Sequence, residues 1–276
     1  MNIKKKGDEN MAIEVFNRYE NKYLLSEKTF AKMERQISGY MELDEYNRRH
    51  EVYSIANIYY DTADNHLIRT SLAKPKYKEK LRLRSYGVPE AGSKVYIEIK
   101  KKVAGLVNKR RSAMMLDEAL AFLGTGEMPL LQEYMNPQVL REIAYMLERY
   151  ALRPALCLSY DRRAWFGIDR NDLRISFDAN IQSRRDDLSL RSGLYGQRLL
   201  PEGVWLMEIK SHTSIPIWLS ALLSEYEIYP QSFSKYGAEY KLWLSDQSDR
   251  VAEHTEPAAR KQKLIHVFSK EVKQYA

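Results

Sequence analysis

Glutamate and lysine recur two positions apart at three places in the chain: Glu20/Lys22, Glu98/Lys100 and Glu208/Lys210. On a β-strand, residues i and i+2 point to the same face and lie about 7 Å apart. Each pair therefore predicts a carboxylate beside an ammonium group. Such pairs are common as cross-strand salt bridges on solvent-exposed sheets. They also suit a site that holds an anion and a cation together.

Arginines follow the same two-residue period. Arg82 and Arg84 alternate with leucines in Lys80-Leu81-Arg82-Leu83-Arg84, and Arg174, Ser176 and Asp178 alternate with apolar residues. Alternation of this kind predicts strands with one polar and one apolar face. Paired guanidinium groups bind phosphate oxygens through forked hydrogen bonds. The candidate chemistry is therefore binding of a phosphorylated anion.

Positive charge is concentrated in one segment. The chain has 276 residues, 44 Lys+Arg against 37 Asp+Glu, and a formal net charge of +7. Residues 74–111 contain nine lysines, four arginines and three acids, a local charge of +10, so the remainder carries −3. Such a segment attracts polyanions: nucleic acid, anionic lipid or a phosphate chain. A flexible, solvated charge run is the alternative, but its apolar residues would not be so regularly spaced.

Several familiar classes of site are absent from the sequence. It has no G-x-x-x-x-G-K-[ST] loop, complete G-x-G-x-x-G motif, G-x-S-x-G motif or HExxH motif. The single cysteine, Cys157, excludes an intrachain disulfide and a four-cysteine zinc site. The five histidines show no short metal-ligand spacing. No apolar signal-peptide core and no run of 18 apolar residues is present, which indicates a cytoplasmic protein.

The elements that would position these residues are mostly strands. We predict strands at residues 16–25, 53–61, 78–86, 94–102, 107–115, 155–166, 173–180 and 204–211. Helices are predicted at about 27–38 after the N-cap Ser26, within 116–150 and at about 215–226, and 184–200 is predicted to be a loop. Without βαβ alternation, the pattern favours an α+β fold with an antiparallel sheet. We expect one domain at 14–244, an N-terminal tail at 1–13, and a tail or docked helix at 245–276.

The direction of the charged faces decides the nature of the site. If they point outward, the apolar faces fill an ordinary barrel core. If they point inward, the barrel encloses a charged tunnel and helices cover its apolar outer face. Unpaired buried charges are costly, so the inward arrangement implies a bound polyanion with a divalent cation.

The order of the motifs resembles a known family. RYENKYLL, IYYDT, KLRLRSYG, VYIEIKKK, LSYDRRAWFG, LRISFDANI, LMEIK and FSKYGAEY, spanning roughly residues 14–243, resemble the VTC (vacuolar transporter chaperone) domain. This is a polyphosphate polymerase domain of the CYTH-like triphosphate tunnel metalloenzyme superfamily. The resemblance implies an antiparallel β-barrel of about eight strands that forms a charged tunnel, with helices packed outside. It therefore supports the inward arrangement.

The resemblance also implies roles for individual residues. Catalytic contacts to phosphate are expected from Lys22, Arg82, Arg84, Lys100, Arg162, Arg174 and Lys235. Further ligand contacts are expected from Tyr160, Ser234, Lys109 and Lys210, with Ser234 and Lys235 on the last strand. Glu208 matches the family's metal-binding glutamate, and Glu20 and Glu98 are additional candidates for Mn²⁺ or Mg²⁺. Lys101, Lys102, Lys109 and Arg110 are candidates to guide the product outward.

The implied activity is transfer of the γ-phosphoryl group of ATP to a growing polyphosphate chain, with phosphate or pyrophosphate as the primer. Arg18 stands where the triphosphatase branch has a first glutamate, which favours the polymerase. Alternatives are a metal-dependent triphosphatase in the same tunnel and a non-catalytic binder of polyphosphate or inositol phosphates. Specific nucleic-acid binding is not expected, because it would not explain carboxylates among the bases. The longer family members' membrane helices are not seen, so any membrane contact is expected through a separate partner.

Overall fold

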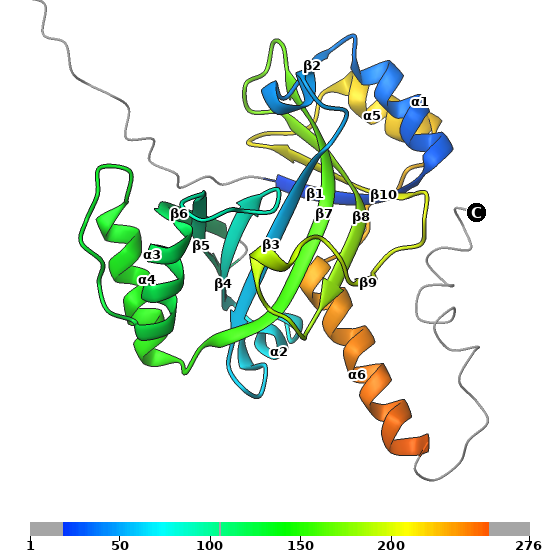
Figure 1. Cartoon of the computed structure of the whole chain (residues 1–276). Helices are drawn as coiled ribbons and strands as arrows, with labels where there is room; N and C mark the ends of the chain where they lie inside the picture. Colours follow the sequence, from blue (N-terminus) through cyan, green and yellow to red (C-terminus); the bar gives the residue numbers. More distant parts are fainter. Residues whose placement is uncertain (1–18, 105, 254–276) are drawn as a thin grey trace, which may run out of the picture.

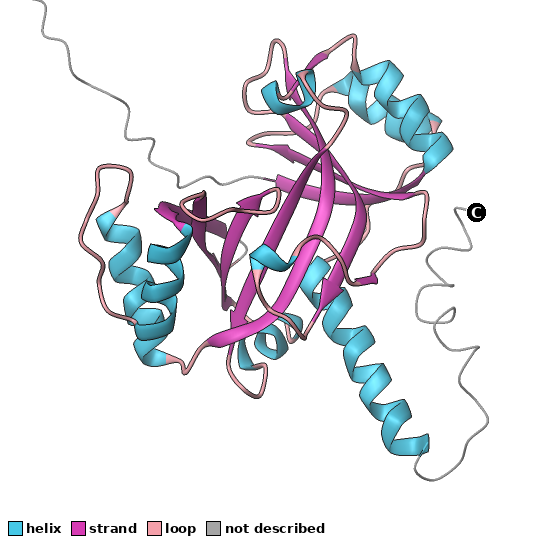
Figure 2. Ribbon diagram, viewed as in Figure 1, coloured by secondary structure: helices cyan, strands magenta, loops and turns pink. Residues whose placement is uncertain are grey.

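The computed structural model describes residues 19–104 and 106–253 and is built on one large antiparallel sheet (Figures 1 and 2). The strands follow the order β1-β10-β8-β7-β3-β4-β5-β6, while β2 pairs with β7 and β9 with β8. Their bounds are β1 Tyr19–Ser26, β2 Met41–Leu43, β3 Tyr53–Asp61, β4 Tyr77–Tyr86, β5 Lys94–Val103, β6 Leu106–Met115, β7 Arg153–Gly167, β8 Arg174–Arg184, β9 Gln197–Arg198 and β10 Val204–Ser211. The predicted α+β class with an antiparallel sheet is confirmed.

The sheet curls strongly, because side chains from strands far apart in this order meet. Lys100 lies on β5 and Glu20 on β1, yet the Lys100 Nζ is 3.8 Å from the Glu20 Oε2. Within residues 19–104 and 106–253, the strand ladder ends at β1 and β6, which do not pair with each other. The predicted barrel is therefore present as a curled sheet, without a hydrogen-bonded seam among the described strands.

Helices lie on both faces of this sheet: most cover its apolar outer face, and the last packs against the other face. Their bounds are α1 Glu27–Ile37, α2 His66–Leu72, α3 Leu116–Thr125, α4 Pro137–Arg149, α5 Ile217–Glu225 and α6 Lys235–Glu253, with short 3₁₀ turns η1 at Glu45–Arg48 and η2 at Leu190–Ser192. The predicted N-cap of α1 is confirmed, because Ser26 accepts a hydrogen bond from the Thr29 N–H. Asn136 caps α4 directly before Pro137.

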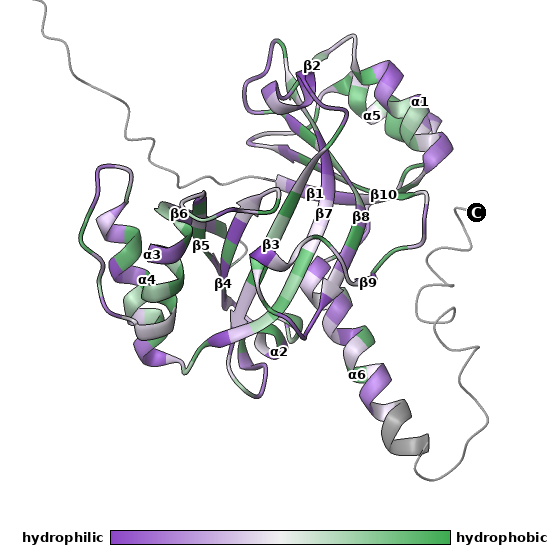
Figure 3. Ribbon diagram, in the orientation of Figure 1, coloured by the Kyte–Doolittle hydropathy of each residue, from purple (hydrophilic) through white to green (hydrophobic). Residues whose placement is uncertain are grey.

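Two apolar clusters fix the orientation of the strands. In the first, Leu81 and Leu83 of β4 and Ile97 and Ile99 of β5 pack with α3 and α4. The second joins β1, β8 and β10 to α1 and α5; its members include Tyr23, Phe177, Met207, Phe30 and Leu219. Figure 3, which colours the ribbon by hydropathy, shows hydrophobic stretches in green on both the helices and the strands. Since alternate residues of a strand point to opposite faces, the charged residues between them must point to the other side of the sheet.

We call that other side the inner face; it is the face that carries Lys22, Arg82, Glu98, Arg162 and Glu208. A third apolar cluster occupies one end of it. Leu24, Leu158 and Leu206 of the sheet pack there against Tyr236 and Tyr240 of α6. The inner face is therefore charged in the middle and apolar at the end where Tyr236 and Tyr240 pack.

Some elements differ from the sequence prediction. Strand β2, the short helix α2 and the two-residue strand β9 were not predicted, because each has too few residues for a clear period. Ser234 and Lys235, expected on the last strand, lie at the start of helix α6 instead. That helix continues without a break past residue 244, the expected end of the domain. The predicted tail at 1–13, and most of the one at 245–276, lie outside the described residues.

No helix in the described ranges has both the length and the apolar character needed to cross a membrane.

Candidate functional site

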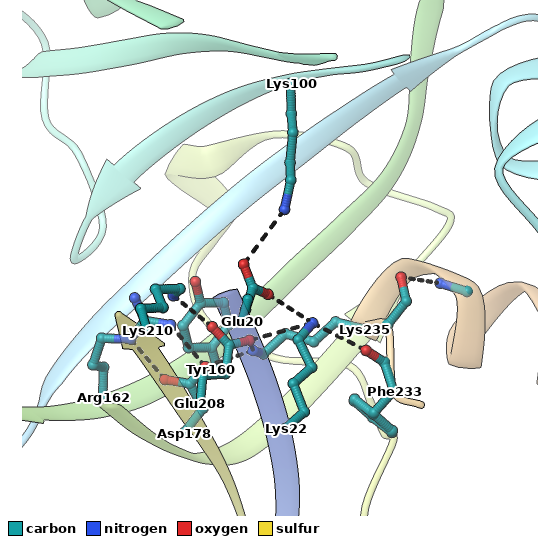
Figure 4. Close-up of polar contacts among 12 residues, drawn as sticks. Glu20, Lys22, Lys100, Tyr160, Arg162, Asp178, Glu208, Lys210, Phe233 and Lys235 are labelled. Carbon is teal, nitrogen blue, oxygen red and sulfur yellow. Dashed lines mark hydrogen bonds and ion pairs between the residues drawn. The ribbon is translucent and has the colours of Figure 1, made fainter. Parts of the chain in front are cut away.

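The first cluster of the site joins strands β1 and β10 to helix α6 (Figure 4). The Lys22 Nζ lies 3.3 Å from the Glu20 Oε1 and 3.5 Å from the Glu208 Oε1. The two strands pair so that Lys22 is directly opposite Glu208. Lys22 also donates a hydrogen bond to the backbone carbonyl of Phe233, just before α6. Two carboxylates from neighbouring strands therefore share one ammonium group.

Glu208 is surrounded by ammonium groups and is almost fully buried. Its Oε2 is 2.7 Å from the Lys210 Nζ, and its Oε1 is 3.4 Å from the Lys235 Nζ. Burial alone would raise the pKa of this carboxyl, but Lys210, Lys235 and Lys22 outweigh it and hold the pKa well below the usual range. Glu208 is therefore a carboxylate at any physiological pH.

A buried ion pair connects β7 to β8. Arg162 Nε donates to Asp178 Oδ1 at 2.7 Å, and Arg162 Nη2 donates to Asp178 Oδ2 at 2.8 Å. The Lys235 Nζ is 2.5 Å from the Asp178 Oδ2. The start of α6 thus bridges Asp178 and Glu208 through a single lysine. Asp178 was not among the predicted site residues, although it shares the two-residue period of Arg174 and Ser176.

A second cluster lies on β4, β5 and β6. Arg82 Nε donates to Glu98 Oε2 at 2.7 Å, and the Lys109 Nζ is 2.9 Å from the Glu98 Oε1. Arg84 donates to Asn57 Oδ1 at 2.9 Å and to the Tyr160 hydroxyl at 3.1 Å. Glu98 therefore pairs with Arg82, Arg84 and Lys109. Glu208 pairs with a different set of bases, Lys22, Lys210 and Lys235.

Three lysines of the inner face, Lys80, Lys100 and Lys109, are held in an environment that disfavours their charge. Burial lowers the pKa of Lys80 to about 8 and that of Lys109 to about 7, with nearby cations adding to the effect. Burial likewise lowers the pKa of Lys100, against the attraction of Glu20. Lys80 is a further basic residue on this face that was not predicted, and its Nζ is 3.5 Å from the Ser234 Oγ. A bound anion would reverse these shifts.

Two buried polar atoms on β8 have no hydrogen-bond partner among the described residues: the Ser176 Oγ and the Arg174 Nε. Ser176 is 1% exposed and lies directly opposite Glu208 in the β8–β10 pairing. A buried polar group without a partner is costly, so such groups usually mark a place where a ligand or water binds. Both atoms belong to the inner face, next to the clusters above.

The structure places the three predicted metal ligands in two separate clusters. No group of three or more His, Cys, Asp or Glu residues forms a metal site within the described ranges. Glu20 and Glu208 lie together around Lys22, with the Ser176 hydroxyl opposite Glu208, whereas Glu98 contacts a separate set of bases. Mg²⁺ in phosphate-processing sites is typically held by one or two carboxylates and the substrate phosphates. Glu20 and Glu208 fit that donor set.

The predicted phosphate contacts mostly lie on the inner face. The contacts above connect most of them there: Lys22, Arg82, Arg84, Lys100, Lys109, Tyr160, Arg162, Lys210 and Lys235. Arg174 lies at the edge of this face, with its Nη2 3.4 Å from the Asp44 Oδ2. Lys101 and Arg110, expected to guide the product, instead both pair with Glu142 of α4 on the outer face. Lys101 directly follows Lys100 and Arg110 directly follows Lys109, so the alternation of side chains along a strand predicts this outer position.

The fold resembles several solved structures. A putative adenylate cyclase from Bacillus halodurans matches with a TM-score of 0.48 and 17% identity, over 80% of this chain and 94% of that one. A putative adenylyl cyclase from Hippeastrum, described as having a dominant triphosphatase activity, matches with a TM-score of 0.44 and 14% identity, over 79% of this chain and 92% of that one. No curated protein matches the sequence.

A family model gives the decisive match. The model of the VTC domain matches residues 17–244, which contain every strand of the sheet and every residue of the two charged clusters. The match begins next to β1 and ends within α6. The chain therefore belongs to the VTC domain family.

Proposed function

We propose that this protein is a metal-dependent polyphosphate polymerase, which transfers the γ-phosphoryl group of ATP to a growing polyphosphate chain. The observation that carries the proposal is the convergence of bases from seven strands (β1, β4, β5, β6, β7, β8 and β10) and the start of α6 on one face, where they outnumber the carboxylates. Mutual repulsion of these bases would be relieved by a chain of linked phosphates.

The arginines and lysines have different tasks in this proposal. Arg82, Arg84 and Arg162 are held by Glu98, Asn57 and Asp178, so that their remaining N–H groups are oriented before the substrate binds. Forked guanidinium groups would bind non-bridging phosphate oxygens, and Lys22, Lys100 and Lys235 would neutralise charge as it develops. Positioning and charge neutralisation are the main requirements of phosphoryl transfer.

Glu208 and Glu20 would hold Mn²⁺ or Mg²⁺, which would neutralise the triphosphate and orient it. Both carboxylates contact Lys22, so the Lys22 ammonium group lies where it would also meet the phosphates. Ser176, directly opposite Glu208, offers an additional oxygen to the bound group.

The state of the carboxylates favours a phosphate acceptor over water. A phosphate chain is already anionic and needs no general base, whereas hydrolysis needs a positioned water. Burial acts to raise the pKa of Glu20, but Lys100 and Lys210 lower it to about 2, and arginines hold the pKa of Glu98 well below its usual range. Both are therefore weak bases. A triphosphatase in the same site is the second candidate.

In this proposal the curled sheet closes around the phosphate chain to form a tunnel, with β1 and β6 as its free edges. ATP, polyphosphate and a phosphate or pyrophosphate primer are the ligands. We further propose a cytoplasmic location, with any contact to a membrane made through a separate protein.

The test is to incubate the protein with ATP and Mn²⁺ and to analyse the products by phosphorus NMR and by gel sizing. We expect signals of internal chain phosphates from the wild type and none from Glu208→Gln. Arg191→Gln, which changes an exposed ion pair with Asp117, serves as the control and should match the wild type. ADP with orthophosphate alone would reject polymerisation in favour of hydrolysis, and binding without turnover would leave a polyphosphate-binding or inositol-phosphate-binding module.

A further inference from the structure

Four tyrosines form a cluster at the edge of the inner face, which we call the rim tyrosines: Tyr46 of η1, Tyr53 of β3, Tyr86 of β4 and Tyr96 of β5. The ring centroids of Tyr46 and Tyr53 are 5.6 Å apart, and those of Tyr86 and Tyr96 are 5.8 Å apart. Tyr46 and Tyr86 are parallel within 2° at 6.1 Å. Tyr46 is 60% exposed and Tyr86 is 40% exposed, so ring surface remains accessible.

The rim tyrosines are continuous with the phosphate-binding bases. Tyr86 follows Arg84 by two residues and so points to the same face. Tyr53 lies directly opposite Arg162 in the β3–β7 pairing, and Tyr96 lies directly opposite Arg84 in the β4–β5 pairing. A substrate that extends from these arginines toward the rim would therefore meet tyrosine rings next.

Ring faces do not suit phosphate. The face of an aromatic ring carries partial negative charge, which repels an anion and attracts cations and the planar edges or faces of other rings. One arginine uses the rim in this way: the Arg111 guanidinium lies 4.7 Å from the centroid of the Tyr96 ring. The rim is thus matched to a flat, uncharged part of a ligand whose charged part lies deeper.

We infer that the rim tyrosines form the subsite for the base of the nucleoside triphosphate, and that they stack on it. The inference rests on the proposed function, which supplies the nucleotide. Arg82 and Tyr86 are four residues apart on one strand, roughly 13 Å along its axis. That interval accommodates the linked phosphates and the ribose between the deeper arginine and the rim. Tyrosine stacking accepts any base, so the subsite favours nucleotides over inorganic phosphates without selecting adenine.

The test compares two ligands that share the triphosphate but not the base. Binding of the β,γ-imido analogue of ATP and of inorganic tripolyphosphate is measured by calorimetry, with Mg²⁺, on the wild type and on Tyr46→Leu and Tyr86→Leu. We expect each substitution to weaken nucleotide binding on the order of tenfold and to leave tripolyphosphate binding unchanged. Tyr86→Phe should retain nucleotide affinity, because the ring remains. Tyr145→Leu, at an exposed tyrosine of α4 on the outer side, is the control.

The outcomes separate this inference from the proposed function. If wild-type protein binds both ligands with equal affinity, or if the leucine variants lose both equally, the base subsite is rejected and the phosphate site stands. If the wild type binds neither ligand, both proposals are rejected. The comparison of the two ligands on the wild type needs no variant, so it decides the question even if a leucine variant folds poorly.

Discussion

The guanidinium of Arg162 and the carboxylate of Asp178 form a buried two-point contact between β7 and β8, with N–O distances of 2.7 and 2.8 Å. Asp178 is fully buried and also holds Lys235, so one carboxylate balances two cations. Burial acts to raise its pKa, but Arg162 and Lys235 lower it. This contact fixes the direction of Arg162 and the position of α6 together.

Removing that carboxylate is expected to destabilise the protein. In Asp178→Asn, Arg162 loses its buried carboxylate and Lys235 keeps only its longer contact with Glu208. Loss of one partner of a buried ion pair typically costs about 3–5 kcal/mol. Urea unfolding measures the change. Tripolyphosphate should restore more stability to this variant than to the wild type. Asp117→Asn, at an exposed pair with Arg191, should change stability by less than about 0.5 kcal/mol. Equal effects of the two substitutions would contradict the role of Asp178.

Ser176→Ala is expected to weaken ligand binding without lowering the stability of the protein. The Ser176 hydroxyl is buried without a partner among the described residues, so its removal should leave the melting temperature unchanged or raise it. Affinity for tripolyphosphate in the presence of Mn²⁺ should fall, since the ligand loses a hydrogen-bonding group. Calorimetry and thermal unfolding measure the two effects. A drop in melting temperature with unchanged affinity would show that the hydroxyl is structural.

Binding of a polyanion is expected to take up protons. The folded-state pKa values of Lys80 and Lys109, about 8 and about 7, lie below the ordinary lysine value of 10.5. At pH values between these and 10.5, the unfolded chain binds more protons than the folded protein does. The two lysines therefore lower the free energy of unfolding at low pH, and this unfavourable contribution is relieved as the pH rises. An anion raises both pKa values again. At pH 8, tripolyphosphate binding should therefore take up on the order of one proton.

The uptake is measured by calorimetry in buffers of different ionisation enthalpy. Lys80→Met should reduce it, whereas Lys28→Met, at an exposed position of α1, should not. The side chain of Lys109 is 41% exposed, so solvent moderates its shift and we expect Lys80 to contribute more. Uptake that is the same in all three proteins would show that Lys80 does not take up the proton.

Substitutions of the candidate metal ligands are expected to differ in their effects on metal affinity and on the KM for ATP. Glu20 shares Lys22 with Glu208, so Glu20→Gln should weaken the apparent affinity for Mn²⁺ measured from the metal dependence of the reaction. Glu98→Gln should leave that affinity nearly unchanged and instead raise the KM for ATP, because Glu98 holds Arg82 and Lys109. The reverse pattern would move the metal site to the second cluster.

The two-residue period was sufficient to predict the longer strands; in the middle of β4, for example, buried Leu81 and Leu83 alternate with Arg82 and Arg84. The same period includes Lys80 and Asp178, so both were within reach of sequence reasoning. The position of Ser234 and Lys235 at the start of a helix could not be predicted in this way. A helix that begins beside the sheet is defined by tertiary contacts such as those of Tyr236 with Asp61, which no local pattern reveals. The choice of inner over outer face also depended on the family resemblance rather than on the alternation.

Helix α6 begins with two consecutive residues of opposite character. Lys235 contacts Asp178 and Glu208, while Tyr236 packs among the leucines at the end of the sheet. Rotation of the helix by one position would move the Lys235 ammonium group into the apolar cluster and the Tyr236 ring toward Asp178 and Glu208. The rotation of α6 about its axis is consequently fixed by ion pairs and by apolar packing together. The packing of Tyr236 therefore sets the position of the cation that the proposed substrate would meet.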